Sequence, residues 1–180
     1  AEVTVENKHE LGALQVTKTE TGNGAGAIDE FEFDVTFTPA DGVQLASSYA
    51  ATYSANGTST PATIEVDEQG RAEFKLTAGQ TITITGLPVG TGYTIEEDPY
   101  TADGYVTTPS TLQASGAIAA NASGVNVPTQ ENCKEFTNAR YVGELTIAKI
   151  LSGDGTDEND VFTFQLQLAN EAGMRLQGNY

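Results

Sequence analysis

The sequence repeats itself at one fixed offset. Residues 5–49 align without gaps to residues 136–180, with an offset of 131 residues, as between Asn7 and Asn138. The identical pairs include Asn7/Asn138, Gly12/Gly143, Leu14/Leu145, Lys18/Lys149, Gly22/Gly153, Gly24/Gly155, Asp29/Asp160, Phe31/Phe162, Phe33/Phe164, Gly42/Gly173, Leu45/Leu176 and Tyr49/Tyr180. Self-similarity at a fixed spacing indicates repeated structural units, and here the unit has the size of a whole domain.

The repeat predicts where domains begin and end. We expect residues 1–10 to be the last strand of a preceding repeat, residues 11–140 to be one complete domain, and residues 141–180 to be the truncated start of the next repeat, ending after two or three strands. The links KHELG and ARYVG between repeats are short. Short links hold neighbouring domains nearly end to end, which favours a rod-like array.

Hydrophobic alternation predicts an all-β fold. Segments such as FEFDVTF (31–37) and TITIT (81–85) alternate with period two, and no long window has helical spacing of apolar residues. Turn-forming dipeptides, among them Asp41-Gly42, Asn56-Gly57 and Leu87-Pro88, separate the segments. The expected strands are 13–20, 31–38, 49–54, 62–66, 71–76, 80–85, 92–97, 104–109 and 133–138. This number of short strands is typical of an immunoglobulin-like β-sandwich.

Charge and composition exclude several functions. The chain has 25 acidic and 8 basic residues, a net charge of −17, which disfavours binding to nucleic acid or to anionic membranes. Cys133 is the only cysteine, so no internal disulfide can form, and His9 is the only histidine, which leaves a histidine triad or zinc site without support. The acidic run 154–160 lacks the spacing of an EF-hand and reads as a solvated loop. We therefore expect no metal, no cofactor and no enzyme acting on other molecules.

Three polar residues have the parity of apolar neighbours in the expected strands. Side chains of one parity face the core of a half-buried strand. Lys18 follows the inward parity of Leu14 and Val16. In the same way Glu97 follows Tyr93 and Ile95, and Asn138 follows Phe136. A lysine, a glutamate and an asparagine are thus each predicted on an apolar face near a strand end.

Such a trio has two interpretations. Lys18 can extend to solvent and Glu97 can form a structural ion pair. Alternatively, burial lowers the pKa of a lysine and raises that of a glutamate, which favours a neutral amine and a protonated carboxyl. A neutral amine is a nucleophile. Lys18 could then attack the side-chain carbonyl of Asn138 with assistance from Glu97, release ammonia, and leave a Lys–Asn isopeptide bond.

Three ordered motifs resemble a known family. ALQVTK (13–18), GLPVGTGYTIEE (86–97) and EFTN (135–138) resemble the Cna-B-like (SpaA-type) domains of Gram-positive pilins and surface adhesins. This resemblance implies a spontaneous intramolecular isopeptide bond between a lysine of the first strand and an asparagine of the last, assisted by an acidic residue of a middle strand. The corresponding residues here are Lys18, Asn138 and Glu97, and Glu96 is expected to point outward.

The flanking repeats contain matching residues. Asn7 corresponds to the acceptor of a preceding domain and Lys149 to the donor of a following one, and neither has all its partners within this chain. The resemblance implies a stalk or pilus-like domain outside the cell, anchored to the cell wall of a Gram-positive bacterium, with neighbouring repeats as partners. The alternative is an adhesin module whose loops bind a host matrix protein or glycan.

Overall fold

A computed structural model of the chain describes residues 10–121, 127–155, 157 and 159–168. The chain divides into two compact units, Ala1–Gly143 and Glu144–Tyr180. Each unit is considered separately. The position predicted for the flanking acceptor, Asn7, lies outside the described residues.

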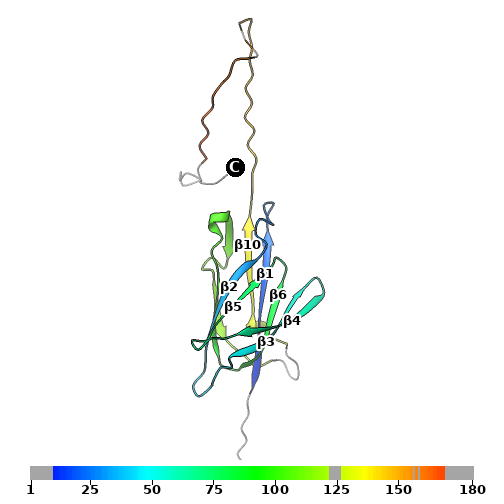
Figure 1. Cartoon of the computed structure of the whole chain (residues 1–180), viewed down its shortest axis with the longest axis vertical. Coiled ribbons are helices and arrows are strands. Elements are labelled where there is room, and N and C mark those ends of the chain that lie inside the picture. The colour runs from blue at the N-terminus through cyan, green and yellow to red at the C-terminus, as the bar shows by residue number, and fades with distance from the viewer. Residues whose placement is uncertain (1–9, 122–126, 156, 158, 169–180) are drawn as a thin grey trace, which may run out of the picture. The chain divides into compact units, whose positions relative to one another are not determined.

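The first unit is a sandwich of two β-sheets (Figure 1), as the sequence predicted. One sheet has six strands in the order β4-β3-β6-β1-β10-β8, and the other has four in the order β5-β2-β7-β9. The strands are β1 (Leu11–Thr21), β2 (Phe31–Thr38), β3 (Ser48–Ala55), β4 (Thr58–Glu65), β5 (Arg71–Leu76), β6 (Thr81–Pro88), β7 (Gly92–Glu97), β8 (Tyr105–Thr108), β9 (Gln113–Ala117) and β10 (Cys133–Arg140). Two short 3₁₀ segments, η1 (Thr101–Asp103) and η2 (Gln130–Asn132), complete the described elements.

The first and last strands lie side by side in the larger sheet. β1 and β10 pair in parallel, from Gln15 opposite Cys133 to Thr21 opposite Ala139. β6 pairs with β1 on its other edge, and β8 pairs with β10. The two ends of the domain are therefore neighbours in space, although more than one hundred residues separate them in the sequence.

The core lies between the two sheets, and strand alternation builds it. Every second residue of β2, from Phe31 to Phe37, is buried, and the residues between them are exposed. Phe33 of the smaller sheet meets Phe136 of the larger one edge to face, with ring centroids 5.2 Å apart. Aromatic contacts of this kind join the sheets, so side chains that share this parity are shielded from water.

Some strand boundaries differ from the predicted ones. β4 begins at Thr58, because Asn56 and Gly57 both have positive φ and form a tight hairpin turn directly after β3. Leu87 and Pro88, predicted as a turn, are the last residues of β6. β9 was not predicted, because its residues QASGA are small and mostly exposed and carry no apolar alternation. As an edge strand, it depends mainly on its pairing with β7.

The described residues of the second unit lack the strands that we expected there. No strand occurs among the described residues 144–155, 157 and 159–168, and most of these side chains are exposed. A β-strand is stable only when a neighbouring strand and a packed face support it. Period-two alternation alone is therefore insufficient here. Within the described part of the chain, no helix has the length and apolar character needed to cross a membrane.

Candidate cross-link site

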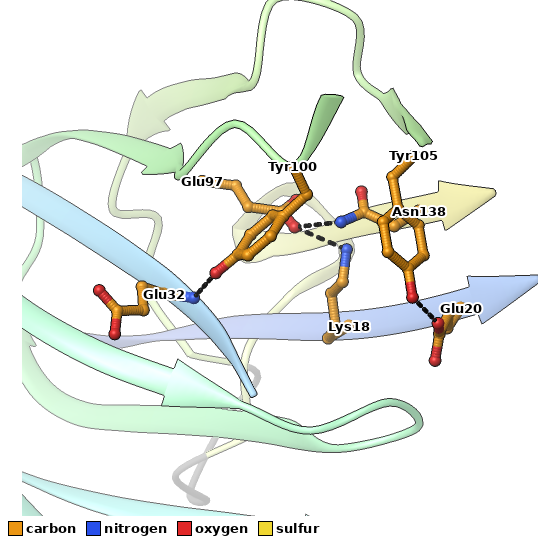
Figure 2. Close-up of polar contacts among 7 residues, drawn as sticks. All are labelled: Lys18, Glu20, Glu32, Glu97, Tyr100, Tyr105 and Asn138. Carbon is orange, nitrogen blue, oxygen red and sulfur yellow. Dashed lines mark hydrogen bonds and ion pairs between the residues drawn. The ribbon is translucent and has the colours of Figure 1, made fainter. Parts of the chain in front are cut away.

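Three strands bring Lys18, Glu97 and Asn138 together inside the sandwich (Figure 2). Lys18 lies on β1 and Asn138 on β10, the parallel neighbours of the larger sheet. Glu97 is the last residue of β7 in the opposite sheet and reaches them across the core. The register places Asn138 two residues beyond the direct partner of Lys18, so both side chains lie on the same face.

All three side chains are fully buried, as their parity predicted. Lys18, Glu97 and Asn138 each have an exposed fraction of 0%. The interpretation in which Lys18 extends to solvent is therefore wrong, because the apolar face of β1 continues to this position without a break. Glu96, the neighbouring acid, points outward as expected, where it accepts a hydrogen bond from the Gln113 side chain.

One carboxylate oxygen contacts both nitrogen atoms of the trio. Lys18 Nζ donates to Glu97 Oε1 at 2.7 Å, and Asn138 Nδ2 donates to the same oxygen at 2.7 Å. Figure 2 shows the lysine and the asparagine converging on the glutamate from neighbouring strands. A single oxygen thus lies within hydrogen-bonding distance of an amine and of an amide nitrogen that could leave.

Burial shifts both ionisable groups of the site toward their neutral forms. Loss of solvation lowers the pKa of Lys18, although its hydrogen bond and charge interaction with Glu97 oppose that shift. Loss of solvation likewise raises the pKa of Glu97, against the effect of Lys18 and of the Asn138 hydrogen bond. Both pKa shifts favour the neutral amine and the protonated carboxyl, whereas the 2.7 Å contact between the two groups favours the charged pair.

Two further polar atoms of the site are buried without a hydrogen-bond partner in the described structure, Glu97 Oε2 and Asn138 Oδ1. Such atoms are uncommon in folded proteins, and a catalytic role is one of the explanations for them. A protonated Glu97 carboxyl is a hydrogen-bond donor, whereas the Asn138 carbonyl is an acceptor. The site therefore contains a buried amine, an amide and a carboxyl group that could transfer protons.

Aromatic residues that the sequence analysis did not assign to the site enclose it. Lys18 Nζ lies 4.2 Å from the centroid of the Phe31 ring. Tyr100 and Tyr105 each meet Phe31 edge to face, with centroid distances of 5.0 and 5.9 Å. Phe31 could have been found from the repeat, because Phe162 occupies its equivalent position, but no sequence pattern places the two tyrosines here.

The remaining candidate residues lie elsewhere. Lys149 belongs to the second unit, where its side chain is exposed and its Nζ lies 4.6 Å from the Phe162 ring centroid. Cys133 is a free thiol at the start of β10, and burial raises its pKa, which disfavours the reactive thiolate. Among the described residues, no group of three or more His, Cys, Asp or Glu side chains could hold a metal ion.

Comparisons with known proteins identify related chains. A pilin of Streptococcus pyogenes serotype M1 is 26% identical over 146 residues, which are 78% of this chain and 43% of the pilin. The chain thus spans less than half the length of this relative. The match confirms the predicted resemblance to domains of Gram-positive pilins.

Solved structures share the fold. A mutant of the major pilin of Streptococcus pyogenes has a TM-score of 0.54 and 23% identity, over 74% of this chain and 49% of that one. A pilus-presented adhesin, Spy0125, has a TM-score of 0.51 and 20% identity, over 73% of this chain and 27% of that one. At these identities the likeness establishes the immunoglobulin-like sandwich.

A family model covers the same domain. The family described as "Domain of unknown function (DUF7601)" matches residues 12–139, a range that includes all three buried polar residues and every strand from β1 to β10 except the outermost residues, Leu11 and Arg140. Because this match extends over more than half of the chain, the protein belongs to the family DUF7601.

Proposed function

We propose that this chain is a structural stalk or pilus-like segment of a surface protein, in which residues 11–140 form a domain closed by a Lys18–Asn138 isopeptide bond. Residues 1–10 and 141–180 would then belong to the neighbouring repeats. The observation that carries the proposal is the contact of one Glu97 oxygen with both Lys18 Nζ and Asn138 Nδ2, at 2.7 Å each, inside a fully buried site.

The reaction would be an amide exchange. Neutral Lys18 Nζ attacks the side-chain carbonyl carbon of Asn138, and the bond from that carbon to Nδ2 breaks. Glu97 accepts a proton from the attacking nitrogen and donates one to the leaving nitrogen, so ammonia departs and the carboxyl is regenerated. Lysine and asparagine become one amide and one ammonia, without oxidant or cofactor.

Fixed geometry would supply most of the rate. Amides resist amines in water, yet well-oriented groups reach effective concentrations of about 10⁵–10⁸ M. Lys18 and Asn138 are held on adjacent strands, and a protonated Glu97 carboxyl would bring a hydrogen-bond donor into a site where the acceptor Asn138 Oδ1 has no partner. This is a single-turnover reaction within the chain, so the protein would not be an enzyme for other molecules.

The bond would make the domain resistant to unfolding and to tension. It closes a loop of about 120 residues, and by the cross-link model such a closure stabilises by about 5 kcal/mol. It joins β1 to β10, where the chain enters and leaves the domain. Tension applied to the ends would pass through the bond and bypass the strands between them, and no reductant could open it.

The relatives support an extracellular role. The related protein of Streptococcus pyogenes is a pilin, so we propose a location on the surface of a Gram-positive bacterium, anchored to its cell wall, with neighbouring repeats or pilin subunits as partners. The alternative is an adhesin that binds a host matrix protein or glycan. Among the exposed large hydrophobic residues of the first unit, Leu11 and Val106 lie on strands, at opposite ends of the larger sheet, whereas Val127, Tyr141 and Val142 lie outside the strands.

Single-molecule pulling from the two termini tests this function. The account predicts that the segment between Lys18 and Asn138 never extends, even at forces that unfold the strands. The Asn138→Ala variant, which cannot form the bond, should instead release a length of about 400 Å for these 120 or so residues. A release of that length by the unmodified chain would contradict a stalk role based on the cross-link.

A further inference from the structure

The segment 98–105, called here the cover segment, connects two strands at the proposed cross-link. It begins directly after Glu97 at the end of β7 and ends at Tyr105, the first residue of β8, which pairs with Arg140 of β10. The middle of the segment, residues 101–104, is exposed, whereas Tyr105 is almost fully buried. The cover segment therefore runs over the end of the core that holds the cluster of Lys18, Glu97 and Asn138, as Figure 2 shows for its two tyrosines.

The first anchor of the cover segment is on β2. The backbone N–H of Glu32 donates to the Tyr100 hydroxyl at 2.8 Å, and the Glu32 carbonyl accepts from the N–H of Asp98 at 3.1 Å. These bonds hold the edge of Tyr100 against Phe31. The face of the same Phe31 ring lies under the Lys18 amine. Phe31 therefore connects this anchor to the reacting nitrogen by direct contacts.

The second anchor is on β1. The Tyr105 hydroxyl donates to Glu20 Oε1, which also accepts the N–H of Gly26 at 2.7 Å. Glu20 lies directly opposite Asn138 in the β1–β10 register, two residues after Lys18 on β1. Tyr105 also meets Phe31 edge to face. Phe31 is thus held between two tyrosines, and only the Tyr105 anchor depends on a side-chain carboxylate.

A third anchor comes from β10. Arg140 Nε donates to the carbonyl of Asp103 at 2.7 Å, and its guanidinium lies 5.9 Å from the centroid of the Tyr105 ring. The cover segment is therefore attached to β1, β2 and β10, of which β1 and β10 carry the two residues to be joined. Among the described residues, the cover segment is the one connection between strands that begins directly after a residue of the cluster, Glu97. It also contacts β1 and β10, the strands that carry Lys18 and Asn138.

Resting on the proposed function, we propose that Tyr105 is a positioning residue for cross-linking, which Glu20 holds in place so that the cover segment excludes water from the cluster. If Tyr105 moves, Phe31 loses one of its two supports and water gains access to the Lys18 amine and the Glu97 carboxyl. Hydration favours the charged forms of both groups, and a charged amine does not attack an amide. Release of the anchor therefore slows the reaction although the reacting groups are unchanged.

The test is the rate of ammonia loss from the full chain on refolding. Unreacted chain is collected in denaturant, diluted into neutral buffer, stopped with acid at successive times, and weighed intact. We expect the Tyr105→Phe and Glu20→Ala variants to react roughly ten- to hundredfold more slowly than the unmodified chain. Glu20→Gln retains an acceptor oxygen for the tyrosine and should restore the rate to within about twofold of the unmodified chain.

The matched control is Tyr93→Phe. Tyr93 is a buried tyrosine of β7 whose hydroxyl donates to the Glu131 carbonyl at 3.3 Å, four positions before Glu97 and away from the cover segment. The Tyr93→Phe variant should lose ammonia at the same rate as the unmodified chain. Equal rates for Tyr105→Phe and Tyr93→Phe, or a Glu20→Gln rate as low as that of Glu20→Ala, would overturn the positioning role. An unmodified chain that folds without losing ammonia would instead overturn the cross-link itself.

Discussion

The two units contain the same lysine–phenylalanine pair in different surroundings. In the first, Lys18 Nζ lies 4.2 Å from the Phe31 ring, and in the second, Lys149 Nζ lies 4.6 Å from the Phe162 ring. These residues correspond to one another at the repeat offset. Lys18 is fully buried and contacts Glu97, whereas Lys149 is exposed and Phe162 is 42% exposed.

The difference separates local from long-range information. Two segments about a dozen residues apart suffice to place the amine near the ring. The acid, Glu97 of β7, lies 79 positions from Lys18 in the sequence, and β10, which also buries the lysine, lies farther still. On our account, reactivity belongs to the complete sandwich, and the lysine motif alone confers none. Four predictions test this comparison.

The largest effect is expected for Asn138→Ala. Loss of the cross-link should lower the free energy of unfolding by about 5 kcal/mol, because the unfolded chain regains its loop entropy. Denaturant titration with the full chain measures this change. The control is Asn132→Ala, which removes another fully buried asparagine whose side chain bonds the backbone of Ala119. That variant should lose only about 1–3 kcal/mol, and an equal loss in both would argue against a covalent contribution.

Phe31→Leu should have the next largest effect. It removes the ring beneath the Lys18 amine and the contacts with both tyrosines and leaves a cavity, at a cost of about 1–3 kcal/mol in the free energy of unfolding. Phe162→Leu makes the same change in the second unit and should leave the first unit's denaturation midpoint unchanged. Equal shifts of the first unit's denaturation midpoint in the two variants would mean that the contact between Lys18 and Phe31 contributes no more to the first unit than the contact in the second unit does.

A pH effect is expected in chains without the bond. Burial raises the pKa of Glu97 in the folded state, so the folded state binds its proton more tightly than the unfolded state does. This stabilisation is fully present below the ordinary glutamate pKa and is lost as the pH rises through the raised value.

The contribution of Glu97 to this pH dependence is isolated by comparing the Asn138→Ala variant with the double variant Asn138→Ala/Glu97→Gln. The free energy of unfolding of the first should fall relative to that of the second as the pH rises from acid toward neutral. A difference that is constant over this range would contradict the raised pKa and, with it, the protonated carboxyl that the reaction needs.

Lys149→Ala should have the smallest effect. The side chain is exposed in the second unit, and surface substitutions usually change stability by less than about 0.5 kcal/mol. The variant should lose the same amount of ammonia as the unmodified chain. A smaller loss would mean that Lys149 reacts, so that the two lysines are more alike than their surroundings indicate.

Sequence reasoning found the buried trio because period-two parity is a local property. Leu14 and Val16 fix the direction of Lys18, and the neighbours of Glu97 and Asn138 do the same for them. Tyr100 was missed because it lies in an irregular connection, where parity has no meaning, and Tyr105 was missed because the parity of β8 does not show which buried cluster it faces. β9 was missed because edge pairing of small residues leaves no apolar pattern.

In the second unit, sequence reasoning failed in the opposite way, because it predicted strands that are not observed in the part of this unit that the structure describes. Its residues repeat the alternation of β1 and β2, which favoured strands, yet none forms among the described residues. Strand formation depends on pairing partners that a local pattern does not contain. The same dependence explains why the parity of Lys149 did not predict its exposure.

The intact mass of the purified chain, followed by peptide mapping around Lys18 and Asn138, tests the central claim most directly. Our account predicts a mass lower than the sequence mass by one ammonia, and a branched peptide that joins Lys18 to Asn138. The full sequence mass, with both residues recovered in separate linear peptides, would contradict it.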